Sequence, residues 1–146
     1  MNWPSHLAFG LVLYAAFIFS SIFFGYHLEV LTIAIGAIIT IPYALLPDID
    51  HDMSKISQVV EILFLGATVV AIAGYFYSKK EELLMVAGFL VALLFVTKFL
   101  RHRGITHTIR FGIAAALPLA LANPLYAVFA FIAFMSHLAA DMHLKL

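Results

Sequence analysis

The chain has 146 residues, of which 64% are hydrophobic and 11% charged, whereas a soluble domain carries about 25% charged residues. This composition excludes a soluble domain and predicts an integral membrane protein that contacts the lipid bilayer. Eight basic residues balance eight acidic ones, so we expect no direct nucleic-acid binding. Because the chain has no cysteine, any metal site must use histidine and carboxylate ligands.

Six apolar stretches follow one another, each close to the roughly 20 residues that a helix needs to cross a bilayer. They are Leu7–Phe24, Leu28–Leu46, Val59–Tyr77, Leu83–Leu100, Ile105–Ala122 and Leu125–Ala140. The fifth contains Arg110 and Pro118, so Ile105–Leu138 is alternatively one span plus a re-entrant segment. We expect an all-α, multi-pass transmembrane helical bundle of six spans, or five, that forms one integral-membrane domain over residues 1–146.

The loops differ in basic residues. With six spans, the N-terminus, the second and fourth loops and the C-terminus share one side of the membrane. That side has six basic residues, against Lys79 and Lys80 on the other, so the positive-inside rule predicts cytoplasmic N- and C-termini. The six are Lys55, Lys98, Arg101, Arg103, Arg110 and Lys145.

The same topology gathers every aspartate and six of the seven histidines at the cytoplasmic face. Ionisable groups close to a bilayer are costly and therefore indicate function. Imidazoles and carboxylates bind zinc, manganese and iron, and carboxylate oxygens also bind magnesium. We therefore expect a His/Asp cluster that holds metal at the cytoplasmic face.

The first candidate ligands lie at the starts and ends of the first two spans. His6 precedes the first span, where a lone interfacial histidine is otherwise a membrane anchor. Asp48, Asp50 and His51 occupy a turn at a helix end, where the backbone can direct several side chains to one point. The alternative is a polar turn whose aspartates cap the next helix.

His102 and His107 are five residues apart, which a regular helix would separate by about 140°. Gly104 between them would break the helix and let both rings turn inward. Thr106 would then cap the fifth helix, and Arg103 would bind an anionic oxygen such as that of a phosphate. The alternative is a basic loop that only sets the orientation of the chain.

His137 and Asp141 are spaced i, i+4 at the end of the last helix and therefore share one helix face. Either both residues bind one metal ion, or Asp141 orients His137. The alternative is a hydrogen bond within the helix.

Taken together, the early histidine and three later motifs resemble the YdjM family over nearly the whole chain. The motifs are Leu46-Pro47-Asp48-Ile49-Asp50-His51, His102-Arg103-Gly104-Ile105-Thr106-His107, and Ser136-His137 with Asp141. Members of this family are described as inner-membrane metal-dependent hydrolases that bind LexA. The resemblance implies an inner-membrane location, metal-dependent hydrolysis and a protein partner. Thr108 departs from the serine that the family commonly has there.

We predict a metal-dependent hydrolase at the cytoplasmic membrane surface, in which metal-activated water attacks an amphipathic substrate, with a lipid phosphoester as the candidate. The ligands are too many for one four-coordinate ion, so we expect two divalent ions, with zinc, manganese, magnesium and iron all compatible. Asp50 or His51 would be the general base, and Arg103 would stabilise developing charge. The expected metal ligands are His6, Asp48, Asp50, His102, His107, His137 and Asp141.

Two other functions are compatible with the same ligands. A metal-ion transporter or sensor would need polar groups through the depth of the membrane, and the spans offer little beyond Glu61 and three threonines. A non-enzymatic membrane scaffold or regulator would need no bound metal.

Overall fold

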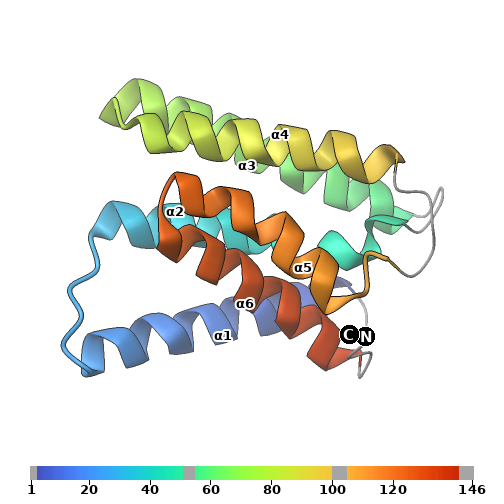
Figure 1. Ribbon diagram of the computed structural model, residues 1–146, viewed down its shortest axis with the longest axis horizontal. Helices are drawn as coiled ribbons and strands as arrows, with labels where there is room; N and C mark the ends of the chain where they lie inside the picture. The colour runs from blue at the N-terminus through green and yellow to red at the C-terminus, as the bar shows by residue number, and fades with distance from the viewer. Residues whose placement is uncertain (1–2, 51–54, 100–104, 142–146) are drawn as a thin grey trace.

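The structure is a computed structural model that describes residues 3–50, 55–99 and 105–141 (Figure 1). The elements in these residues are helical, as the composition predicts. They are α1 (Trp3–Phe23), α2 (Val30–Tyr43), the 3-10 helix η1 (Leu46–Asp50), α3 (Lys55–Ser78), α4 (Glu81–Phe99), α5 (Ile109–Ala116), the 3-10 helix η2 (Leu117–Leu121) and α6 (Pro124–Ala140).

The helices form a bundle in which α3 and α4 are an antiparallel pair along one side and α1 lies at the opposite side (Figure 1). Between them, α6 packs against α1, α2 and α5. The start of α1 meets the end of α6, where His6 Nε2 lies 3.2 Å from Asp141 Oδ1. We call this the site end of the bundle, because η1 and the start of α5 also lie there (Figure 1), and the opposite end the far end.

Three described helical segments are long and apolar enough to cross a membrane, against the six spans expected. They are Trp3–Phe23, Val30–Asp48 and Glu61–Ser78. Two shorter apolar segments, Ile109–Leu121 and Pro124–Ala140, do not reach this length. The structure thus has the apolar helices of a membrane protein, whereas the sixfold crossing stays a prediction.

The fifth stretch is divided where the sequence is least regular. α5 ends after eight residues, and the chain continues as η2 with Pro118 in its first turn. Proline lacks the N–H that an α-helix needs at this position. With typical helical rises, Ile109–Leu121 is about 22 Å long, shorter than the roughly 30 Å hydrocarbon core. The segment nonetheless connects the two ends of the bundle, since Asn123, which follows it, lines a pocket with His27 and Lys80 at the far end.

Small residues let the helices approach closely near the site end. A Cβ added at Gly10 of α1 would lie 2.8 Å from the Cβ of Ala44 and 3.2 Å from the Oγ of Ser136. Glycine is common where membrane helices cross, because it lets their backbones come together. Gly10 therefore allows α1 to bring His6 against the residues that follow α2 and those of α6.

Candidate metal site

The turn after α2 leaves one carbonyl group available to another part of the chain. The carbonyl oxygen of Ala44 would normally accept a bond from the N–H three or four residues later. Pro47 has no N–H, and the N–H of Asp48 instead donates to the carbonyl of Leu45 at 3.1 Å. Ala44 is fully buried, so its carbonyl needs another donor.

That donor is His137, one turn before the end of α6. Its Nδ1 lies 2.9 Å from the Ala44 carbonyl oxygen, and its side chain is fully buried. A carbonyl oxygen only accepts hydrogen bonds, so Nδ1 must carry the proton. In a neutral ring, Nε2 then presents its lone pair, which is the form of histidine that binds metals.

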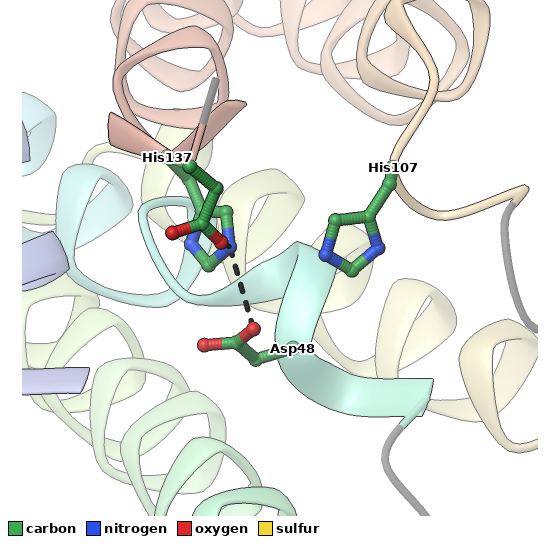
Figure 2. A group of neighbouring side chains, drawn as sticks. Asp48, His107 and His137 are labelled. Carbon is green, nitrogen blue, oxygen red and sulfur yellow. Dashed lines mark ion pairs between the residues drawn. The ribbon is translucent and has the colours of Figure 1, made fainter. Parts of the chain in front are cut away.

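Two carboxylates face this nitrogen. Asp48 Oδ1 lies 3.3 Å from Nε2 of His137, and Asp141 Oδ2 lies 3.4 Å from the same atom. Figure 2 shows His137 and Asp48 directed toward each other from α6 and η1. Asp48 therefore comes to the site from the Pro47 turn, and Asp141 from the C-cap position of α6.

His107 adds a second imidazole from the turn before α5. Thr108 caps this helix, since its side chain accepts a hydrogen bond from the N–H of Phe111 at 3.2 Å. The expectation that Thr106 caps the helix is therefore wrong. Thr106 is buried, and its Oγ1 lies 3.3 Å from Nδ1 of His107. The His107 ring points toward Asp48 and His137 (Figure 2).

These four side chains form a group that could hold a metal ion. One ligand atom from each of Asp48, His107, His137 and Asp141 lies within 4.8 Å of the others. The group combines two carboxylates with two imidazoles, which is a donor set that transition metals accept.

His6 lies beside this group. Its ring stacks on that of His137 with the ring centroids 3.9 Å apart, and its Nε2 contacts Asp141 at 3.2 Å. Only 1% of His6 is exposed, and its Nδ1 has no hydrogen-bond partner among the described residues. This position is compatible with two roles for His6: it orients Asp141, or it is itself a ligand of the ion.

The electrostatics of the group fit a cation. Nε2 of His137 is buried and has no hydrogen-bond partner in the described part of the chain, although two carboxylates face it. Burial raises the pKa of the Asp141 carboxyl, but the imidazoles of His6 and His137 are among the groups that lower it, and the net pKa lies below its usual value. Asp141 is thus ionised at neutral pH, as a metal ligand must be.

The structure brings together five of the residues expected at the site: His6, Asp48, His107, His137 and Asp141. His51, His102 and Arg103 lie outside the described residues, and only the backbone of Asp50 lies within them. The sequence interpretation missed the role of the Ala44 carbonyl, although Pro47 after an apolar helix signals a carbonyl without its usual partner.

A sequence model of the YdjM inner membrane protein family matches residues 1–145 of the chain. No curated protein and no solved structure gives a significant match.

Proposed function

The chain belongs to the YdjM inner membrane protein family, and we propose that it is a metal-dependent hydrolase whose ion is held by Asp48, His107, His137 and Asp141. The observation that carries the proposal is the environment of His137. A buried Nε2 faces two carboxylate oxygens at 3.3 and 3.4 Å, so one nitrogen and two oxygen donors converge on a point where a metal ion would bind all three.

Three of the four ligands have a neighbour that sets their orientation. The Ala44 carbonyl holds His137 in the tautomer whose Nε2 faces the carboxylates, and Thr106 contacts His107 at 3.3 Å. His6 contacts Asp141 at 3.2 Å. Partners of this kind commonly affect metal affinity by about 10–100-fold.

A divalent ion in such a site supplies a Lewis acid and lowers the pKa of water. The two carboxylates offset the charge of one divalent ion, and the two imidazoles favour zinc or iron, whereas magnesium prefers oxygen ligands. A second ion would need ligands from Asp50 or His102, in addition to those in the group. We retain Asp50 or His51 as the proposed general base and Arg103 as the residue that stabilises developing negative charge.

The substrate we propose is amphipathic, with a lipid phosphoester as the first candidate. The ligand group lies at one end of a bundle whose helices are apolar enough for a bilayer, so a bound substrate would have its polar part at the membrane surface. We propose that this is the cytoplasmic surface and that both chain termini lie there.

Metal content and hydrolysis test the proposal together. The protein purified in detergent is analysed for bound metal beside Asp48→Ala and His137→Ala, with His27→Ala at the far end as the matched control. We expect metal and hydrolysis of phosphoesters in the wild type and control, and loss of both in the two site variants. A wild type that takes up no zinc, manganese, iron or magnesium would exclude the hydrolase and favour a scaffold or regulator.

A further inference from the structure

An apolar groove of about 330 Å³ lies between α4 and the α5–η2 segment. Phe89, Leu93 and Val96 line it on the α4 side, and Phe111, Ala115 and Pro118 line it on the other. The α4 set has the spacing i, i+4, i+7 and forms one helix face, whereas the other set runs from α5 into η2. The groove is therefore bounded by two helix faces that lie opposite each other.

The α4 face and the α5–η2 face that bound the groove do not pack closely against each other. α4 packs on α3 and touches η2, while its contact with α5 is slight at most. Val96, Ala114 and Pro118 are exposed, so the groove opens on the outside of the bundle. In a bilayer nothing drives such a gap to close, because lipid chains are as apolar as the side chains.

The lining determines the chemistry of the occupant. None of the residues that line the groove carries a charge, so the groove suits hydrocarbon and gives a headgroup or charged peptide no partner. The lined length of seven residues corresponds to about 10 Å of helix. The uncharged lining therefore suits the methylene groups of an acyl chain, which the bilayer around the helix supplies.

One end of the groove adjoins the ligand group. Phe111, which lines the groove, donates its N–H to Thr108, the residue after His107. Its ring also packs against Phe134, 6.1 Å between centroids, one turn before His137. From Phe111 the groove extends along α5 toward Pro118, away from the ligands.

We propose that this groove holds one acyl chain of a phospholipid, whose phosphoester end then lies at the ligand group. The assignment of this lipid as substrate rests on the proposed function, whereas occupancy of the groove does not. The chain in the groove would position the polar end of the lipid beside His107.

Photolabelling tests the groove without turnover. The full chain is placed in phosphatidylcholine vesicles that contain a little phosphatidic acid with a diazirine in its acyl chain, and labelled residues are mapped by mass spectrometry. We expect more labelling of Val96 and Phe111 than of Ile62 and Leu65, which are exposed on α3. Equal labelling of both pairs would mean ordinary lipid contact and overturn the proposal.

Filling the groove provides the matched comparison. Ala114→Trp and, from the α4 side, Ala92→Trp should reduce labelling of Phe111 to the level of the α3 residues, while Ala73→Trp on the exposed face of α3 should not. Unchanged labelling in both groove variants would overturn the proposal. Stronger labelling by a photoactivatable free fatty acid would overturn the assignment to a phospholipid.

The outcome is separable from that of the hydrolase test. Labelling of Phe111 should persist in His137→Ala, because no ligand of the metal lines the groove. Groove labelling in a protein that binds no metal would leave the lipid site standing and remove the hydrolase. Metal-dependent hydrolysis together with equal labelling of the groove and the exposed face of α3 would support the hydrolase and exclude the lipid site.

Discussion

His137 Nδ1 donates a hydrogen bond to the carbonyl oxygen of Ala44 at 2.9 Å, across 93 residues of sequence. This contact orients the ring so that Nε2 faces Asp48 and Asp141. One backbone oxygen therefore decides which nitrogen is available to a metal ion.

His137→Asn and His137→Gln separate the two functions of this ring. An asparagine amide can replace Nδ1 as the donor to Ala44, whereas its side chain is too short to replace Nε2. We expect His137→Asn to keep its folded state and to lose bound metal, as measured by circular dichroism and elemental analysis. His137→Gln, which lacks the donor near Ala44, should lose stability as well. Retention of metal by His137→Asn would show that Nε2 is no ligand.

His6→Ala tests whether His6 orients Asp141 or binds the ion itself. The contact of His6 with Asp141 at 3.2 Å predicts a loss of metal affinity of about 10–100-fold, the usual effect of an orienting neighbour. Competition with a chelator of known affinity measures this change. Complete loss of metal, equal to that of His137→Ala, would make His6 a ligand, and unchanged affinity would leave it a packing residue.

Metal should stabilise the folded protein, because its ligands come from η1, the turn before α5 and the end of α6. At a free metal concentration of 100 times Kd, the expected gain is about 2.7 kcal/mol. Thermal unfolding in detergent, with and without chelator, measures it. His27→Ala should gain as much as the wild type, and His137→Ala should gain nothing. An equal gain in His137→Ala would point to binding elsewhere.

Gly112→Ala should destabilise the contact between α5 and α6. The added Cβ would lie 2.4 Å from Cδ1 of Phe134, which is fully buried, and overpacking of this kind costs about 1–3 kcal/mol. Gly88→Ala is the control, since nothing lies within 4 Å of its added Cβ and alanine favours a helix. Unfolding in denaturing detergent compares the two variants. Equal stability would mean that Phe134 moves aside at no cost.

The membrane orientation can be tested with single cysteines, because the chain has none of its own. Gln58 is exposed near the start of α3, and Lys79 is exposed in the turn after it, so the two report on opposite ends of that helix. In intact cells, an impermeant maleimide should label Lys79→Cys, and it should label Gln58→Cys only after permeabilisation. The opposite pattern would place the ligand group on the outer side.

Two features of the sequence predicted which residues would lie together: their types, and the side of the membrane on which each loop falls. His6, Asp48, His107, His137 and Asp141 were all expected at one face, and the structure brings them together. The cap at Thr108 was not predicted, because both Thr106 and Thr108 can accept the bond from a first-turn N–H. Only the conformation of the preceding turn distinguishes them.

The spans show the limit of the same reasoning. Hydropathy located each apolar stretch to within a few residues, since a helix in lipid needs a continuous apolar surface. It did not show that Ile109–Leu121 divides into two short helices. A proline breaks a membrane helix or only bends it, depending on whether neighbouring helices bind the backbone groups that it leaves unpaired, and Pro118 is such a case.

The sequence alone determined that this is a helical membrane protein of the YdjM family, and it predicted histidines and aspartates at one face, since composition and order are local properties. Tertiary structure decided which atoms meet. Gly10 lets α1 come close, Pro47 frees the Ala44 carbonyl, and α6 brings His137 to it. These contacts join residues far apart in the chain, and their geometry follows from how the helices pack.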